Sequence, residues 1–192
     1  MAGKLLLLRR HLPYNPPMFT DTHCHLADPA LLPQLPEVLA AARAANVRRF
    51  IVPATCRADW AAVLALGAVD IHSAIGIHPW FAAEAGADDL AALSQLLAQH
   101  PQALVGEIGL GSLLLNPAAK KARQAAAALP LEHIVLETDS PFMLKNQTNT
   151  PANVRAIAET VAGLRGISVE ALSMQTEINV TQLLAFHTNP KK

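Results

Sequence analysis

Two histidines separated by one residue, His23 and His25, follow a short segment, Phe19–Thr20, that favours a β-strand. Side chains alternate between the two faces of a strand, so both imidazoles point to the same side and suit one metal ion. The chain breaks at Leu26–Pro29, which places the pair at the carboxyl end of the strand, where α/β folds keep their chemistry. For an isolated pair the alternative is one histidine satisfied in the core and one exposed.

Further candidate residues fall at or near the carboxyl ends of other predicted strands: His78, Glu107, Glu137 and Asp139. Such ends converge on one face of a parallel βα architecture, so distant residues can share a pocket. Imidazole and carboxylate together suit Zn, Mn or another transition metal, or Mg when oxygen ligands dominate. A divalent ion would lower the pKa of a bound water. Asp139 would hold the metal and also accept a proton from that water.

Each of these residues also has a structural interpretation. Asp139 could simply cap a turn before Pro141, and Glu137 could orient a ligand or bind the backbone. His78 could cap a strand or touch substrate. Glu107 lies inside an apolar strand, where burying an unpaired carboxylate is costly, and this favours a functional role for Glu107.

The whole-chain composition indicates one folded domain. The chain has 192 residues, 52% of them hydrophobic, which is enough to bury a core. The net charge is zero and no run of Lys or Arg exceeds two residues, so there is no broad electrostatic footprint for nucleic acid or an anionic membrane. Cys24 and Cys56 have no paired spacing, which fits a reducing cytoplasm. Cys24 faces away from the two histidines by alternation, and we expect it to pack in the core.

Apolar strands alternate with helices along most of the chain, the pattern of a parallel sheet covered by helices. After the first strand, the pattern predicts strands at Arg49–Ala54, Ile71–Ile77, Ala103–Leu110 and Ile134–Thr138. It predicts helices at Glu37–Asn46, Asp59–Leu66, Asp88–His100, Ala118–Ala128, Asn153–Leu164 and Val169–Phe186, the last with a possible break near Glu177.

Residues 1–17 are expected to form a disordered extension before a single domain spanning 18–192. The run Leu5–Leu8 is too short for the apolar region of a signal peptide, and three prolines discourage regular structure. No transmembrane span is predicted. Met18 is an alternative start, directly before the first strand.

Four motifs in order carry a family resemblance: FTDTHCHL at 19–26, GIHP at 76–79, GEIGL at 106–110 and LETDSP at 136–141. They resemble the TatD family of metal-dependent deoxyribonucleases, within the wider amidohydrolase-like group. The resemblance implies a TIM-type barrel and hydrolysis of phosphodiester bonds in DNA. His23, His25, Glu107 and Asp139 match the family's positions for one metal, with Glu107 bridging to a second and acting with Asp139 in catalysis.

The chain departs from this family after Leu110. A complete barrel usually needs about 250 residues. Family members continue with two further strands, each ending in a metal-binding histidine, whereas here Leu110 meets Gly111-Ser112. We expect an internal deletion near 110/111, an incomplete TIM-barrel-derived parallel fold missing about three strands, and loss of the second metal's histidines.

Two functional hypotheses follow. The first is a metal-dependent, TatD-type hydrolase with one divalent ion, Mg, Mn or Zn, DNA as substrate and impaired activity. The alternative is a catalytically inactive remnant that binds at most a metal or a partner. No histidine lies between Leu110 and His133, which favours the second hypothesis for activity, while the motifs favour the first for ancestry. The sequence leaves the oligomeric state open.

Overall fold

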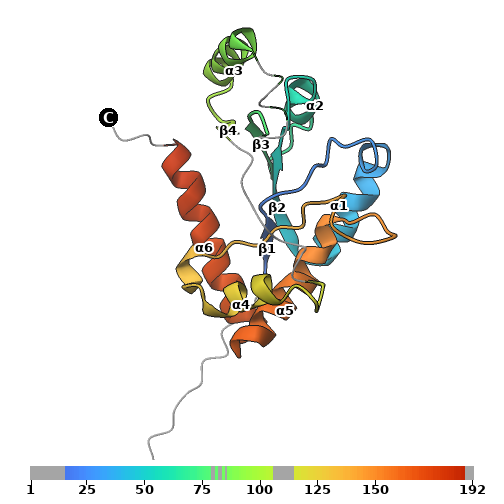
Figure 1. Cartoon of the computed structure of the whole chain (residues 1–192), viewed down its shortest axis with the longest axis vertical. Helices are drawn as coiled ribbons and strands as arrows, with labels where there is room; N and C mark the ends of the chain where they lie inside the picture. The colour runs from blue at the N-terminus through green and yellow to red at the C-terminus, as the bar shows by residue number, and fades with distance from the viewer. Residues whose placement is uncertain (1–15, 79–80, 82–83, 85, 106–114, 189–192) are drawn as a thin grey trace, which may run out of the picture.

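The computed structural model describes residues 16–78, 81, 84, 86–105 and 115–188. Strands and helices alternate through the first half of this chain, and helices dominate the second half (Figure 1). The strands are β1 (Phe19–Asp21), β2 (Val47–Pro53), β3 (Ile71–Ile75) and β4 (Leu104–Val105). The α-helices are α1 (Leu35–Ala44), α2 (Trp60–Ala65), α3 (Ala87–Gln99), α4 (Lys120–Ala128), α5 (Val154–Arg165) and α6 (Val169–Thr188). Short 3₁₀ turns are η1 (Leu32–Gln34), η4 (Leu131–His133) and η5 (Pro151–Asn153).

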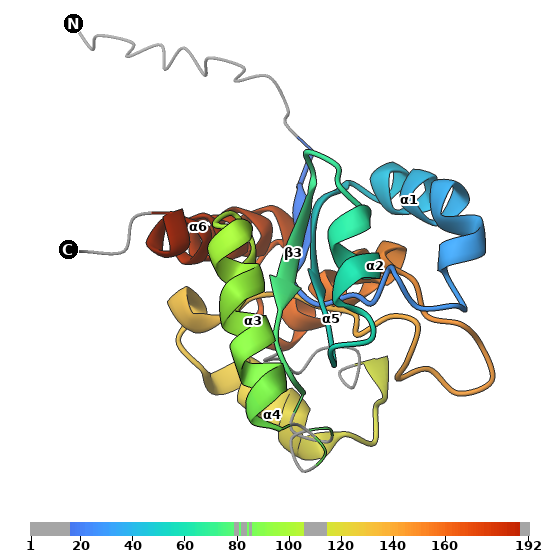
Figure 2. The ribbon, with the colours of Figure 1, turned by 90° about the horizontal axis from the view of Figure 1, so that it is seen from above.

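The four strands form one parallel sheet in the order β1-β2-β3-β4, which is half of a barrel. The expected incomplete TIM-barrel-derived α/β fold is therefore confirmed. Figure 2 shows α1 and α2 on one side of β3 and α3 and α6 on the other. At the far edge, Val105 of β4 is 66% exposed, so the described residues leave this end of the sheet largely uncovered.

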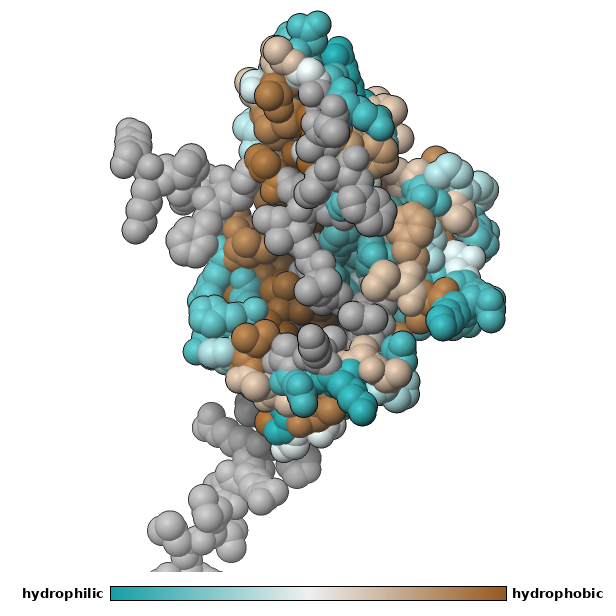
Figure 3. Space-filling model, viewed as in Figure 1, coloured by the Kyte–Doolittle hydropathy of each residue, from teal (hydrophilic) through white to brown (hydrophobic). Residues whose placement is uncertain are grey.

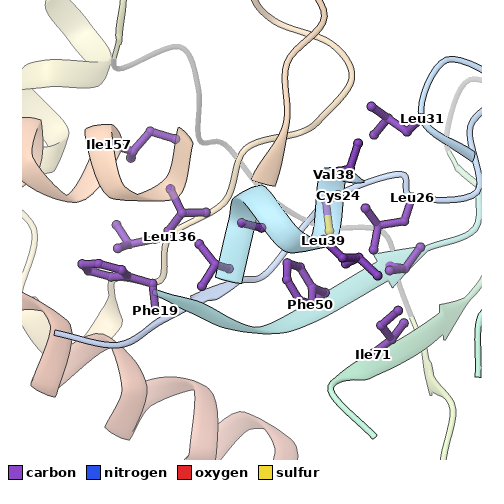
Figure 4. Close-up of a cluster of buried hydrophobic side chains, with 14 of the residues drawn as sticks. Phe19, Cys24, Leu26, Leu31, Val38, Leu39, Phe50, Ile71, Leu136 and Ile157 are labelled. Atoms are coloured by element: carbon purple, nitrogen blue, oxygen red, sulfur yellow. The ribbon is translucent and has the colours of Figure 1, made fainter. Parts of the chain in front are cut away.

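The hydrophobic core lies between the first two strands and the helices α1 and α5. Phe19 and Phe50 are fully buried. They lie in one cluster with Leu39 of α1, with Ile157 of α5, and with Leu136, which precedes the helix (Figure 4). These helices cover the strands because each presents an apolar stripe at helical spacing, such as Ile157, Ala158 and Val161. The packing around the first strand thus depends on α5, which lies more than 130 residues later in the sequence.

Helix boundaries follow local capping chemistry. Asp89 accepts a hydrogen bond from the Gly86 N–H at 2.9 Å, which caps the first turn of α3. Gly166 ends α5 with a φ of 66°, a left-handed conformation that costs glycine little. The predicted helices at 88–100 and 153–164 are each confirmed to within about one residue.

Two predictions about elements were wrong. The expected strand at Ile134–Thr138 is not a regular strand. Residues 136–140 instead meet the segment that follows β1 through scattered backbone hydrogen bonds and one bridge between Cys24 and Ser140. The anticipated break near Glu177 is absent, because α6 continues from Val169 to Thr188. Glu177 instead pairs with Arg49 of β2 and accepts a hydrogen bond from Thr20 at 3.1 Å, which attaches α6 to the sheet.

Most of the predicted strand at Ala103–Leu110 lies outside the described residues. Within its described part, Leu104–Val105 form β4. The same holds for the predicted extension up to residue 15, so the proposed division at residue 17/18 stays a prediction. No helix in the described parts of the chain combines the length and hydrophobicity needed to cross a membrane.

Candidate metal centre

His23 and His25 lie just beyond the end of β1, with both side chains buried. Their rings meet edge to face, with centroids 4.9 Å apart, and their Nε2 atoms are separated by 3.1 Å. The predicted convergence of the two imidazoles is present. Cys24 between them turns the other way into the apolar core, where its Sγ lies 3.7 Å from the Ile51 carbonyl oxygen. Burial raises the pKa of the Cys24 thiol well above its ordinary value, which disfavours the thiolate that a metal requires.

The segment 136–140 brings Asp139 to the two histidines by running beside β1. The Thr22 N–H donates to the Leu136 carbonyl at 2.9 Å, and the Asp139 N–H donates to the His23 carbonyl at 2.8 Å. The His25 N–H donates to the Ser140 carbonyl at 2.7 Å. The backbone of His23 is therefore bonded directly to that of Asp139, and the backbone of His25 to that of the residue after Asp139.

Asp139 adopts a φ of 57°, a left-handed conformation that is uncommon outside glycine and concentrates at functional sites. Its Oδ1 lies 3.5 Å from His23 Nε2 and 3.3 Å from His25 Nε2. The three side chains converge, with all ligand atoms within 4.8 Å of one another.

This donor set fits a divalent metal ion. Two nitrogens bound to one zinc ion at about 2.1 Å lie roughly 3.4 Å apart in a tetrahedral site, close to the separations found here. Two imidazoles and a carboxylate suit Zn or Mn better than Ca, which prefers an all-oxygen shell. The arrangement also leaves coordination positions for water or substrate.

Glu137 lies behind His23, with its Oε2 3.8 Å from His23 Nδ1 and its side chain buried. A carboxylate on this side of a ligating histidine orients the ring and raises its basicity. This position supports the ligand-orienting interpretation of Glu137 over a direct ligand role.

Asp21 ties the two ligand-bearing segments together. Its carboxylate accepts hydrogen bonds from the backbone N–H groups of His23, at 3.2 Å, and Thr138, at 2.9 Å. The Thr138 hydroxyl donates to the same carboxylate at 2.6 Å. Burial raises the pKa of Asp21 to about 7, with a smaller contribution from Asp139, and these hydrogen bonds oppose the rise.

A cavity of about 650 Å³ opens over the three candidate ligands. Its polar lining comprises His23, His25, Asp28, Thr55, Asp59, His78 and Asp139. Asp59 accepts hydrogen bonds from the N–H and the hydroxyl of Thr55 at 2.8 and 2.7 Å, so this carboxylate holds the loop after β2. The cavity is large enough for a nucleotide-sized ligand beside the metal position.

Comparison with known sequences assigns the chain to a family. The family described as TatD related DNase matches residues 20–116 and 111–185, which together cover most of the chain. The chain belongs to the TatD family. The two matched stretches share residues 111–116, the pattern of an interrupted family domain, and they meet where the deletion near 110/111 was expected.

Individual TatD relatives match over shorter stretches. The uncharacterized metal-dependent hydrolase YcfH of Escherichia coli K12 is 37% identical over 78 residues, which are 38% of this chain and 29% of YcfH. The 3′-5′ ssDNA/RNA exonuclease TatD of Klebsiella pneumoniae is 33% identical over 75 residues, covering 35% of this chain and 28% of that protein. These matches span less than a third of each curated relative.

A solved TatD structure supports the fold. The crystal structure of YjjV, a TatD homologue from E. coli K12, superposes with a TM-score of 0.70 at 20% identity. The superposition covers 91% of this chain and 98% of the YjjV chain. The described strands and helices are therefore arranged as in the fold of a TatD homologue.

The structure brings together three of the four ligands expected by resemblance to TatD proteins: His23, His25 and Asp139. Glu107 lies outside the described residues. His78 lines the same cavity, and its contact with a substrate stays a prediction. Sequence reasoning missed Asp21. This residue stands two residues before His23 in the first strand, a signal comparable to that of Glu107.

Proposed function

We propose that this protein is a metal-dependent hydrolase that cleaves phosphodiester bonds of DNA through one divalent ion, with activity below that of complete TatD enzymes. The observation that carries the proposal is the convergence of His23, His25 and Asp139 beneath a nucleotide-sized cavity. These residues lie within the two stretches that match the family described as TatD related DNase.

In this proposal His23, His25 and Asp139 hold Mg, Mn or Zn, with Glu107 as a further ligand. When bound, the ion would polarise a phosphoryl oxygen and lower the pKa of a water. The side chain of Asp139 is 27% exposed, against 5% for His23, so its carboxylate reaches the cavity and can accept the proton of an attacking water. Glu137 keeps the His23 ring in its orientation, and His78 contacts the substrate from the cavity wall.

DNA is the proposed substrate because the matching family is described as TatD related DNase and because one relative is named as a nuclease. The K. pneumoniae relative is named for exonuclease activity on single-stranded DNA and RNA. The chain has no net charge to attract a long polyanion, so the phosphate would be held locally at the metal.

The reduced activity follows from the proposed deletion. Residues 111–132 contain no histidine, so the two histidines that TatD proteins use for a second metal have no counterpart there. One ion lacks the two-metal clamp that stabilises both the attacking and the leaving oxygen. We propose that the protein turns over with one ion, more slowly than a two-metal enzyme.

A second candidate is a non-catalytic remnant that binds a metal or a partner. It is favoured by the division of the family match into two stretches near residue 111. Both candidate functions assume descent from a TatD protein, and they differ in whether the protein hydrolyses its ligand.

Hydrolysis of single-stranded DNA with Mn²⁺ or Mg²⁺ decides between them. Purified protein should release nucleotides in a metal-dependent manner, and the double variant His23→Ala plus His25→Ala should abolish this. The matched control replaces His100 and His133, which lie outside the cavity lining, and should retain activity. A folded, metal-loaded protein without turnover would contradict the hydrolase proposal and favour the second candidate, a non-catalytic remnant.

A further inference from the structure

Phe142 is an aromatic residue exposed at the candidate metal centre. Half of its surface is accessible, although large apolar side chains are normally buried. Its ring centroid lies 5.6 Å from that of His25 in an edge-to-face arrangement with an interplanar angle of 64°. The ring therefore stands next to a metal-ligand candidate and still presents surface to the cavity that it lines.

The backbone holds Phe142 in place. Its N–H donates to the Asp139 carbonyl at 2.8 Å, and its own carbonyl accepts from Asn149 Nδ2 at 2.9 Å. Asn149 is fully buried and also donates to the Thr138 carbonyl at 2.8 Å. Thus one buried amide fixes the backbone on both sides of Asp139 and presents Phe142 beside it. A preorganised aromatic ring loses little entropy when it binds a ligand.

Much of the remaining cavity lining is apolar. Phe81, Met143, Pro29, Pro53 and Val63 contribute apolar surface. Among the described residues that line the cavity, none is Lys or Arg. The described lining therefore offers an anionic substrate no Lys or Arg side chain, and flat or apolar contacts can add to the affinity that the metal provides.

Figure 3 shows a band of hydrophobic residues to the left of the centre of one face of the molecule, with hydrophilic residues towards both edges. Two features mark Phe142 among the hydrophobic residues of the cavity: its ring lies next to His25, and hydrogen bonds fix the turn that carries it. A flat ring at this position suits a ligand that has an aromatic face beside the group held at the metal position.

We propose that Phe142 stacks against a nucleobase adjacent to the scissile phosphate, so that the site recognises unstacked bases of a single strand. The inference rests on the proposed function, because it assumes that the phosphate binds at the metal position. A base inside a duplex has both faces covered by its neighbours, whereas a single strand offers a free face to the ring. The contact tolerates every base, because each has a π-face.

The experiment compares two oligonucleotides of equal length and charge, one with normal bases and one in which every nucleotide is an abasic tetrahydrofuran analogue. Affinity for the full chain is measured by fluorescence anisotropy with Mn²⁺, and hydrolysis is followed in parallel. Stacking of one base corresponds to at least about a fivefold preference for the base-bearing strand. Phe142→Leu should reduce this preference to less than about twofold, whereas Phe142→Tyr should keep it.

Met174→Ala serves as a matched control, because Met174 is 67% exposed on α6 and does not line the cavity. It should leave the preference unchanged. Equal affinity of the wild type for both strands, or an undiminished preference in Phe142→Leu, would overturn the stacking role even if hydrolysis occurs. A base preference that depends on Phe142 without any hydrolysis would support stacking and contradict the proposed hydrolase.

Discussion

The carboxylate of Asp21 and the hydroxyl of Thr138 lie 2.6 Å apart across the junction between the first strand and the segment that carries Asp139. Both side chains are fully buried, and the Thr138 N–H donates to the same carboxylate at 2.9 Å. This pair replaces part of the regular ladder between the two segments. The placement of Asp139 relative to His23 and His25 therefore depends on side-chain as well as backbone hydrogen bonds.

Replacing Thr138 by Val should weaken metal binding. The substitution keeps the shape of the side chain and leaves Asp21 without its hydroxyl donor, which should lower the free energy of unfolding by about 1–3 kcal/mol. Displacement of Asp139 should raise the dissociation constant for Mn²⁺ about tenfold or more, as for other groups that support metal ligands. Calorimetric titration measures the affinity. Thr138→Ser is the control and should remain near wild type, and equal affinities for Val and Ser would exclude this role.

The sequence pattern identifies α3 well, because its apolar periodicity and its capping residues agree. It also identifies β2 well, from a run of apolar residues. It fails at Ile134–Thr138, because an apolar run favours a strand while the buried Asp21 carboxylate takes the Thr138 N–H from the ladder. It also suggests a break in α6 at Glu177, where the charged residue is in fact paired with Arg49. Competition of this kind depends on residues more than 100 positions away and is invisible to local reasoning.

The residues of the candidate site likewise fall into those that the sequence predicts and those that depend on contacts between distant segments. His23, His25 and Asp139 follow from motif order and from the convergence of strand ends. Asp21 and Phe142 meet their partners Thr138 and His25 only when β1 and the segment after it pack against residues 136–142. The position of Asp21 two residues before His23 marks it as a candidate, but a single sequence does not show which residue it contacts.

Removing the ion pair between Glu177 and Arg49 should loosen α6. The two side chains are 13% and 25% exposed, and Arg49 Nε also donates to Thr20 Oγ1 at 3.1 Å. Glu177→Ala leaves a largely buried guanidinium without its counterion, so we expect a loss of about 2 kcal/mol, between the values for exposed and fully buried pairs. Urea unfolding measures it. Glu159→Ala, which removes the exposed pair with Arg155, should cost less than about 0.5 kcal/mol; similar losses in both variants would refute the difference.

His72 should make the fold sensitive to mild acid. Burial, with a smaller contribution from Arg49, lowers the pKa of His72 below its ordinary 6.5, and Asp70 partly opposes this. At His72 the unfolded state therefore binds more protons than the folded state just below about pH 6.5, so the contribution of this residue to stability falls as the pH drops through this range, whereas that of Asp21 has the opposite sign. His72→Gln should therefore shift the change in urea resistance between pH 7.5 and 5.0 towards smaller loss or larger gain than in the wild type. The exposed His133→Gln provides the comparison; an unchanged loss in His72→Gln would contradict the expectation.

Glu107→Gln tests the ligand proposed from the GEIGL motif. A carboxamide lacks the negative charge that a divalent cation favours, so Mn²⁺ affinity should fall at least about tenfold, the lower range for disturbed metal sites. Glu132→Gln, a change at the exposed η4 turn, is the matched control and should bind as wild type does. Unaltered affinity in Glu107→Gln would remove Glu107 from the proposed ligand set.

The most direct measurement is a calorimetric titration of the metal-free protein with Mn²⁺ or Zn²⁺, alongside His23→Ala plus His25→Ala and Asp139→Asn. The account predicts one ion per chain in the wild type, no measurable binding in the double variant and a clear loss of affinity in Asp139→Asn. Two ions per chain, or one ion retained in the folded double variant, would contradict the single centre built from His23, His25 and Asp139.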